Sequence, residues 1–153
     1  MSGSDDYNAS IIAEFRANEG QVGGPWAGYP VILIHHVGAR SGVERVTPLG
    51  CFPQPDGSYV VVASNGGSAN HPAWYHNVKA NPVIRVEFGA ELFWVTVHEV
   101  RGAARARLWP TLVAEAPQLE DYQQKVERRI PVLALTRGRG VAQVGLGGRT
   151  ARR

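Results

Sequence analysis

The chain has 153 residues, of which 44% are apolar and 19% are charged, a composition typical of one globular domain. No apolar run approaches the ~20 residues of a membrane-spanning helix, and the acidic, polar start MSGSDDYNAS is unlike a secretory signal. Cys51 is the single cysteine, which excludes an internal disulfide and favours a reducing, cytoplasmic location.

Positive charge is concentrated at the end of the chain, in the segment RGRGVAQVGLGGRTARR at 137–153. Its arginines are Arg137, Arg139, Arg149, Arg152 and Arg153. Without these five positive charges, the formal net charge of +3 falls to −2. Because the segment is rich in glycine and arginine and has no aromatic residue, we predict a disordered tail. A nucleic-acid partner is not expected, since the rest of the chain is slightly acidic.

The first element expected along the chain is an amphipathic helix at 5–18, where apolar residues recur at helical spacing. With the loop EGQVGGPWAGYP, it forms an N-terminal segment of residues 1–30. Three strands are then predicted from length, β-branching and turn signals, at 31–37, 44–52 and 58–64. Asp56-Gly57 predicts a tight hairpin between the second and the third.

A helix at 72–80 is predicted next, beginning at Pro72 and ending before Asn81-Pro82. The alternating pattern that follows indicates a hairpin at 83–100, with its turn at Gly89-Ala90. The last predicted elements are helices at 102–116 and 118–129, separated by Pro117, and a strand at 130–137. Pro110 is expected at a bend or at a helix start.

The strands in this order are mostly connected by hairpins and do not alternate with helices, so a doubly wound parallel sheet is excluded. We therefore predict a mainly β fold with peripheral helices (α+β). The predicted architecture is a small antiparallel barrel of about six strands over residues 31–136.

Signatures of several common enzyme and metal sites are absent from the sequence. GARSG at 38–42 is not the G-x-S-x-G motif, and neither a P-loop nor a dinucleotide fingerprint occurs in the right setting. His71 and His76 are five residues apart, a poor spacing for one helical face, so no metal site is predicted.

A basic turn between the first two strands clusters polar side chains around two glycines. Its residues are Arg40, Ser41, Arg45 and Thr47, in VGARSGVERVTP. Backbone N–H groups in such a turn form a concave surface, and two guanidinium groups can clamp a phosphate. A solvated hairpin turn paired with Glu44 explains the same residues, so the turn alone does not decide between the two.

A second motif, Ser64-Asn65-Gly66-Gly67, follows the third strand and precedes the helix at 72–80. Free N–H groups at the strand end and the positive end of the helix favour an electron-rich ligand there. Trp74 and Asn77 are three residues apart, which places a stacking surface beside an amide. The alternative is a glycine-rich connector with a core tryptophan. The two motifs together predict one elongated site for a phosphate and a planar ring.

These motifs resemble the deazaflavin-dependent nitroreductase and quinone reductase family. Its members are split-β-barrel, FMN-binding-like proteins of actinobacteria that use the reduced coenzyme F420. The matching stretches are GARSG at 38–42, RVTPL at 45–49, DGSYVVVASNGG at 56–67, HPAWYHNVKANP at 71–82, EDYQ at 120–123 and RIPV at 129–132. The resemblance covers residues ~30 to 136. It implies the same coenzyme and a hydride-transfer activity for this chain.

The resemblance also implies which residues contact the coenzyme. Those assigned to its phosphate and acidic tail are Arg40, Ser41 and Arg45, with Thr47 and Pro48 beside them. Those assigned to the deazaflavin ring are Ala63, Ser64, Asn65, Gly66, Ala73, Trp74 and Asn77. Relatives often carry a lysine at the position of Asn65, so a charge at this position is not carried over.

On the substrate side the chain departs from the nitroimidazole-activating members, which carry several tyrosines in the segment that matches 114–123. Only Tyr122 is present here, with Ala116 and Leu119 at two tyrosine positions and Gly50 where those members have an aromatic residue. We expect hydride transfer from reduced F420 to a quinone, an activated alkene or a nitroaromatic. Tyr122 and Ser64 are the candidate catalytic residues, as proton donors, with water as an alternative.

The sequence leaves alternatives open for the coenzyme and its role, for the assembly and for contact with a membrane. The chain could instead be an FMN-dependent oxidoreductase of the pyridoxamine-phosphate-oxidase type, or a non-catalytic F420 carrier. The expected assembly is a monomer or a homodimer. A peripheral contact with the membrane, where quinones dissolve, is compatible with a cytoplasmic protein.

Overall fold

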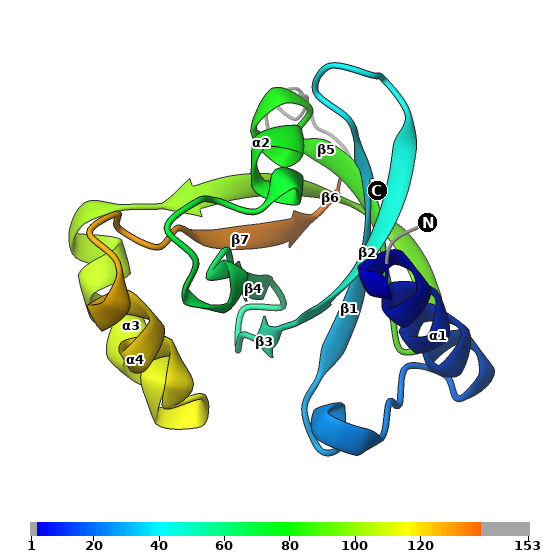
Figure 1. Cartoon of the computed structure of the whole chain (residues 1–153), viewed down its shortest axis with the longest axis horizontal. Helices are drawn as coiled ribbons and strands as arrows, with labels where there is room; N and C mark the ends of the chain where they lie inside the picture. The colour runs from blue at the N-terminus through cyan, green and yellow to red at the C-terminus, as the bar shows by residue number, and fades with distance from the viewer. Residues whose placement is uncertain (1–2, 139–153) are drawn as a thin grey trace.

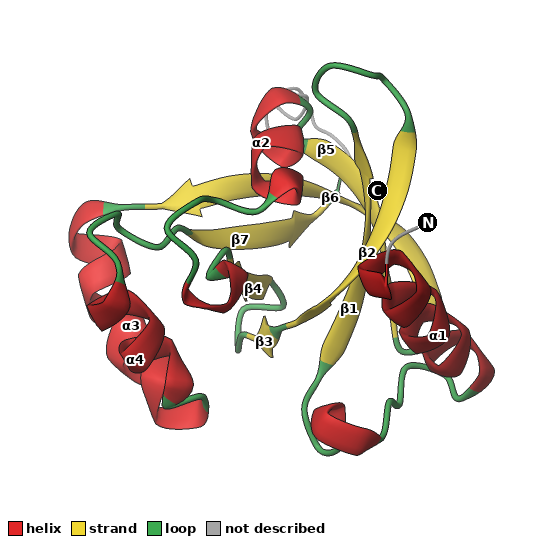
Figure 2. Cartoon of the chain, in the orientation of Figure 1, coloured by secondary structure: helices red, strands yellow, loops and turns green. Residues whose placement is uncertain are grey.

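The computed structural model describes residues 3–138, which form one curved sheet with helices around it (Figures 1 and 2). The helices are α1 (Gly3–Ala17), η1 (Gly24–Trp26), η2 (Asn65–Gly67), α2 (Ala73–Ala80), α3 (Gly102–Glu115) and α4 (Gln118–Lys125). The strands are β1 (Val31–Val37), β2 (Glu44–Gly50), β3 (Phe52–Pro53), β4 (Tyr59–Val62), β5 (Val83–Phe88), β6 (Glu91–Val100) and β7 (Val132–Arg137).

The sheet has the strand order β2-β1-β5-β6-β7-β4-β3, and each neighbouring pair is antiparallel. β2 and β3 are therefore the two edges, yet only Cys51 separates Gly50 from Phe52. Two edges joined by one residue must lie close together, so the sheet curls into a barrel that is split between β2 and β3. The predicted split β-barrel is confirmed.

The sheet has seven strands instead of about six because the segment predicted at 44–52 is divided at Cys51. The Cys51 N–H donates to Pro30 O at 3.0 Å and not to a neighbouring strand of the sheet. Beyond it, Phe52 pairs with Val60 of β4 instead of continuing along β1. A change of pairing partner at a single residue leaves no periodicity signal in the sequence.

β1 is buried on both faces, which explains its continuous apolar run. Ile32 and Ile34 belong to the core inside the barrel, whereas Val31 and Leu33 pack against Phe15 of α1. Full burial of a side chain of this size stabilises a fold by about 1.5–3 kcal/mol. In Figure 1, α1 and the α3–α4 pair cover opposite ends of the sheet, and α2 lies above it.

Pro110 was expected at a bend or at a helix start; it lies inside α3, so the helix start is wrong. Proline removes one backbone hydrogen bond from a helix. Packing overcomes this loss, because Leu108 and Leu112, on either side of Pro110, belong to the same apolar cluster. The Thr111 hydroxyl also donates to Leu108 O at 2.7 Å.

The helix predicted at 118–129 ends at Lys125, and the strand predicted at 130–137 begins at Val132. The side chain of Gln123 holds the connection between them. Its Nε2 donates to Arg128 O at 2.8 Å, and its Oε1 accepts from Ile130 N at 2.9 Å. These side-chain bonds satisfy backbone groups that a longer helix or strand would pair.

Glu99 fastens α2 to β6. Its Oε1 accepts hydrogen bonds from Tyr75 Oη at 2.8 Å, Lys79 Nζ at 2.8 Å and Arg101 Nη2 at 3.1 Å. Burial opposes ionisation of this carboxyl, but the hydrogen bonds outweigh it and lower the pKa of Glu99 to about 2. The carboxylate is therefore ionised at neutral pH and holds α2 in a fixed position beside the sheet.

No helix among residues 3–138 is long and apolar enough to cross a membrane. Of the tail predicted at 137–153, the part from 139 onward lies outside the described residues.

Candidate active site

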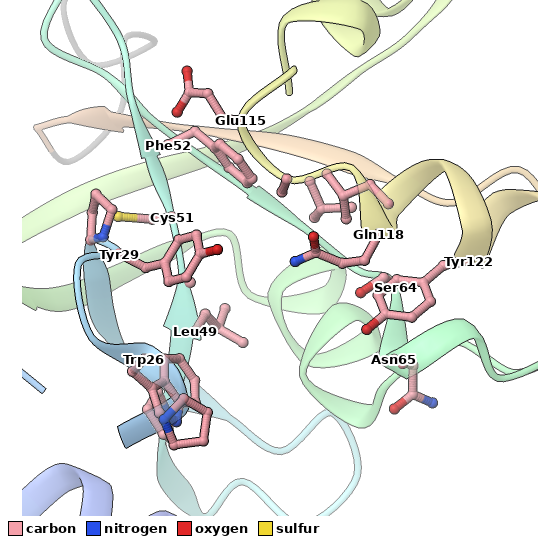
Figure 3. Close-up of a pocket in the computed structure, with 18 of the residues that line it drawn as sticks. Trp26, Tyr29, Leu49, Cys51, Phe52, Ser64, Asn65, Glu115, Gln118 and Tyr122 are labelled. Atoms are coloured by element: carbon pink, nitrogen blue, oxygen red, sulfur yellow. The ribbon is translucent and has the colours of Figure 1, made fainter. Parts of the chain in front are cut away.

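A cavity of about 1070 Å³ opens where the barrel is split. Its walls come from the loop before β1, the β2–β3 edge, the corner after β4, the start of α2 and the α3–α4 pair. Figure 3 shows Ser64, Asn65 and Tyr122 on one side and Trp26, Tyr29 and Leu49 on the other, with the Gln118 side chain between them. A space of this size suits a coenzyme and a second small molecule.

Residues from both predicted motifs meet in this cavity. Those that line it are Thr47, Pro48, Ser64, Asn65, Gly66, Trp74 and Tyr122. The other predicted site residues, which do not line it, are Arg40, Ser41, Arg45, Ala63, Ala73 and Asn77. Gly50, Ala116 and Leu119 also line it.

The basic turn lies beyond the cavity wall, with Arg40 and Arg45 exposed. Ser41 Oγ closes the turn by accepting from Val43 N at 3.1 Å. Glu44 pairs with Arg85 at 3.2 Å, so it does not neutralise the turn arginines. Among residues 3–138, neither Arg40 nor Arg45 forms an ion pair. Their guanidinium groups are free for an anion.

Two of the residues assigned to the coenzyme, Ala63 and Asn77, lie behind the cavity wall. Ala63 is fully buried in the barrel core. Asn77 is buried, and its Oδ1 accepts from Ala39 N at 2.9 Å. This bond connects α2 to the basic turn, so the two motifs are held together directly.

The corner after β4 exposes bare backbone to the cavity. Asn65, Gly66 and Gly67 have φ angles of 51°, 63° and 85°, in the left-handed region that glycine adopts most readily. A Cβ atom on Gly67 would lie 3.1 Å from Tyr122 Cδ1, whereas one on Gly66 would meet nothing within 4 Å. Gly67 thus permits the close approach of α4, and Gly66 leaves its side of the cavity open.

Arg128 holds this corner from behind, and the sequence analysis missed it. Its guanidinium donates to the carbonyl oxygens of Ala63 at 3.3 Å, Ser64 at 2.9 Å and Ser68 at 3.1 Å. It also contacts His71 Nδ1 at 2.9 Å. Burial and the adjacent Arg128 charge lower the pKa of His71, so the neutral imidazole can accept this bond. No carboxylate among residues 3–138 pairs with Arg128.

The orientation of the corner amides follows from these contacts. In a trans peptide the N–H points away from the preceding carbonyl oxygen, and no peptide bond among residues 3–138 is cis. Because Arg128 binds the oxygens of Ala63 and Ser64, the N–H groups of Ser64 and Asn65 point away from it. Within the described part of the chain, these two N–H groups make no hydrogen bond. They are therefore free donors for a ligand.

Residues 3–138 offer neither a reactive cysteine nor a metal-binding cluster. Burial raises the pKa of Cys51 to about 12, so its thiol stays protonated and is a poor nucleophile. No group of three His, Cys, Asp or Glu side chains among residues 3–138 could hold a metal ion. The site offers hydrogen-bond donors, aromatic surfaces and positive charge. Such a site suits an anionic, planar coenzyme that would supply the reactive group.

Comparison with known proteins agrees with this description. Residues 10–137 match the family model described as F420H(2)-dependent quinone reductase. The chain belongs to this family. The F420H(2)-dependent quinone reductase Rv1261c of Mycobacterium tuberculosis is 36% identical over 129 residues, which cover 82% of this chain and 86% of that protein. The predicted family and its enzymatic nature are thereby confirmed.

Solved structures of similar sequence share the family's fold. A structure described as F420-H2 Dependent Reductase (FDR-A) has a TM-score of 0.62 and 39% identity, and covers 69% of this chain and 93% of its own. A structure described as a domain-swapped dimer has a TM-score of 0.65 and 33% identity, with coverage of 88% and 99%. The heme storage protein HutZ from Vibrio cholerae, at 13% identity and TM-score 0.54, shares only the split-barrel fold, over 87% of this chain and 92% of its own.

Proposed function

We propose that this chain binds coenzyme F420 along the cavity and catalyses hydride transfer from the reduced coenzyme to a quinone. The observation that carries the proposal is the meeting of the two predicted motifs at one cavity, through Thr47 and Pro48 from one side and Ser64 to Gly66 from the other. Membership of the quinone reductase family supports both the coenzyme and the acceptor.

The residues present fit the coenzyme at both ends. Arg40 and Arg45 have no carboxylate partner among residues 3–138, and they would hold the phosphate and the acidic tail by charge-assisted hydrogen bonds. The bare backbone at Gly66 would lie against the ring, and Trp74 would pack beside it. When bound, the reduced deazaflavin supplies a hydride from its C5 carbon.

The protein contributes binding, orientation and electrostatics to this transfer. The free N–H groups of Ser64 and Asn65 would stabilise negative charge on the pyrimidine side of the ring. Arg128 strengthens this effect, because its unneutralised charge lies directly behind the same peptide groups. Tyr122 and Ser64 both line the cavity and are the proposed proton donors to the reduced acceptor.

The acceptor would occupy the other half of the cavity. Trp26, Tyr29, Phe52 and Leu119 give this half an aromatic and apolar lining. Small residues at Gly50 and Ala116 enlarge it. A flat, weakly polar molecule such as a quinone suits these walls. Activated alkenes and nitroaromatics are proposed as further acceptors.

The test is an anaerobic assay in which the protein is mixed with reduced F420 and a menaquinone analogue, while coenzyme absorbance is followed. Oxidation of the coenzyme at a rate proportional to protein concentration is expected. Tight binding without turnover for any acceptor would identify a carrier, and preferential binding of FMN would identify a flavin enzyme. Either result would overturn the proposal.

The proposed assembly is a monomer or a homodimer, and one similar structure is described as a domain-swapped dimer. Light scattering on the purified protein distinguishes the two states. Co-sedimentation with quinone-containing vesicles tests the proposed peripheral contact with a membrane.

A further inference from the structure

We infer that His36 is a positioning residue, which fixes the hydroxyl of Thr47 as a hydrogen-bond donor to a phosphoryl oxygen in the cavity. This inference rests on the proposed function for the identity of the ligand. The hydrogen-bond directions themselves do not depend on it. They follow from three contacts that run from the basic turn through α2 and β1 to β2.

The first contact fixes the orientation of the Asn77 amide. The backbone N–H of Ala39 can only donate, and it lies 2.9 Å from Asn77 Oδ1. Asn77 Nδ2 therefore faces His36 Nδ1, at 2.9 Å. Since an amide nitrogen carries hydrogens and no free acceptor site, His36 Nδ1 must be unprotonated.

The second step fixes the tautomer of His36. An imidazole without a proton on Nδ1 is neutral and carries its hydrogen on Nε2. His36 Nε2 lies 2.8 Å from Thr47 Oγ1, so it donates to that oxygen. Burial, with smaller contributions from the charges of Arg45 and His35, lowers the pKa of His36 to about 4. The ring is thus neutral at pH 7, as the hydrogen bonds require.

The third step concerns the hydroxyl hydrogen of Thr47, which remains available to a ligand. Thr47 Oγ1 accepts from His36, and its own O–H has no other partner among residues 3–138. Thr47 lines the cavity. A hydroxyl in this state can donate a hydrogen bond to an acceptor atom of a ligand. Arg45 is opposite His36 in the β1–β2 register, and Arg40 follows Ala39. The positive charge of Arg45 beside His36 favours a phosphoryl oxygen over a neutral acceptor at this subsite.

The first experiment measures the tautomer directly in the protein without coenzyme, by ¹⁵N NMR of the histidine rings at pH 7. The His36→Gln variant assigns the His36 signals among the five histidines. We expect a protonated Nε2 and a bare Nδ1. Observation of the opposite tautomer, or of an imidazolium, would overturn the inference whether or not the protein binds F420.

The second experiment is a double-mutant cycle on coenzyme affinity, followed by fluorescence titration. Thr47→Val should weaken F420 binding by about 10- to 100-fold, because a hydrogen bond to a charged group is lost. Thr47→Ser, which keeps a hydroxyl, should restore most of the affinity. Thr96→Val is a matched control, since the Thr96 hydroxyl bonds Gly138 O on the exposed part of β6.

The same double-mutant cycle tests the role of His36. His36→Leu should weaken binding, and Thr47→Val should then cause little further loss, because the hydroxyl is no longer oriented. His36→Gln retains a donor near the Nε2 position and should recover part of the affinity. Full additivity of His36→Leu and Thr47→Val, in variants with native-like melting, would contradict the coupling.

The phosphoryl assignment is tested with the phosphate-free deazaflavin riboside. Thr47→Val should weaken binding of F420 but not of the riboside. Equal loss for both ligands would overturn the assignment while leaving the proposed function intact. Failure of the unmodified protein to bind either ligand would instead refute the proposed function. The NMR result still decides the His36 tautomer in that case.

Discussion

Replacement of Arg128 by lysine is the most direct test of how the corner after β4 is built. Lysine keeps the positive charge, but a single ammonium cannot reach the carbonyl oxygens of Ala63, Ser64 and Ser68 in the way the guanidinium does. A hydrogen bond to a charged group contributes about 1.5–3 kcal/mol. Loss of one or two such bonds destabilises the native corner by roughly 2–4 kcal/mol.

This destabilisation should appear locally, because the barrel core does not depend on Arg128. When only a fraction of molecules hold the binding-competent corner, the apparent affinity falls by that fraction. Taking 1.4 kcal/mol per tenfold change, a destabilisation of about 2 kcal/mol in Arg128→Lys is expected to weaken F420 binding by up to roughly 30-fold. Fluorescence titration measures the affinity, and hydrogen exchange of the amides at 64–68 measures the order of the corner.

Arg129→Lys provides the matched control, since Arg129 is the exposed neighbour of Arg128 and should affect neither measurement. If Arg128→Lys bound F420 as tightly as the parent, with unchanged exchange at 64–68, the reasoning about oriented peptide groups would be refuted. Loss of affinity without faster exchange at 64–68 would also contradict this account, because the loss would not come from disorder of the corner.

Three further predictions concern charge, proton transfer and stability. Arg40→Ala combined with Arg45→Ala should weaken F420 binding at least tenfold, by loss of two charge-assisted contacts; unchanged affinity in a fluorescence titration would exclude a phosphate clamp. Tyr122→Phe should lower kcat at least tenfold with the KM for coenzyme changed less than roughly twofold; an unaffected kcat would transfer the role to Ser64 or to water. Glu99→Gln should lower the free energy of unfolding at pH 7 by roughly 1–2 kcal/mol. Because the pKa of Glu99 is lowered from 4.5 to about 2 in the folded protein, its contribution is lost as pH falls through this interval. The two proteins should therefore converge in urea unfolding near pH 2, and a constant difference from pH 7 to pH 2 would contradict this account.

The strands with the strongest local patterns could be predicted from sequence. β1 spans the predicted residues 31–37, and the β5–β6 hairpin lies within 83–100 with its turn at Gly89-Ala90. In both cases the order of apolar and polar residues within a short segment is enough to predict the strand. The division of 44–52 at Cys51 and the helix through Pro110 depend instead on contacts with distant elements.

The same holds for the candidate site: features of a short segment could be predicted from the sequence, whereas contacts between distant residues could not. The two motifs could be found in the sequence because each lies within a short segment, and the structure places residues of both at one cavity. The aromatic wall of the cavity was missed, since Trp26, Tyr29 and Phe52 meet only after the barrel curls. Arg128 was also missed, because its partners lie 57 to 65 residues away in sequence. Alternation along the strand implies that one of His35 and His36 faces the core, but the sequence could not say which of them does or name its partners.

The single residue between β2 and β3 has a consequence for the shape of the cavity. Since Cys51 alone joins the two edges of the sheet, covalent connectivity as well as packing limits how far the edges can separate. The width of the binding space is thus restrained by a tether one residue long. Lengthening that tether by a few flexible residues would relax the curvature and uncouple the two halves of the site, even with every lining side chain unchanged.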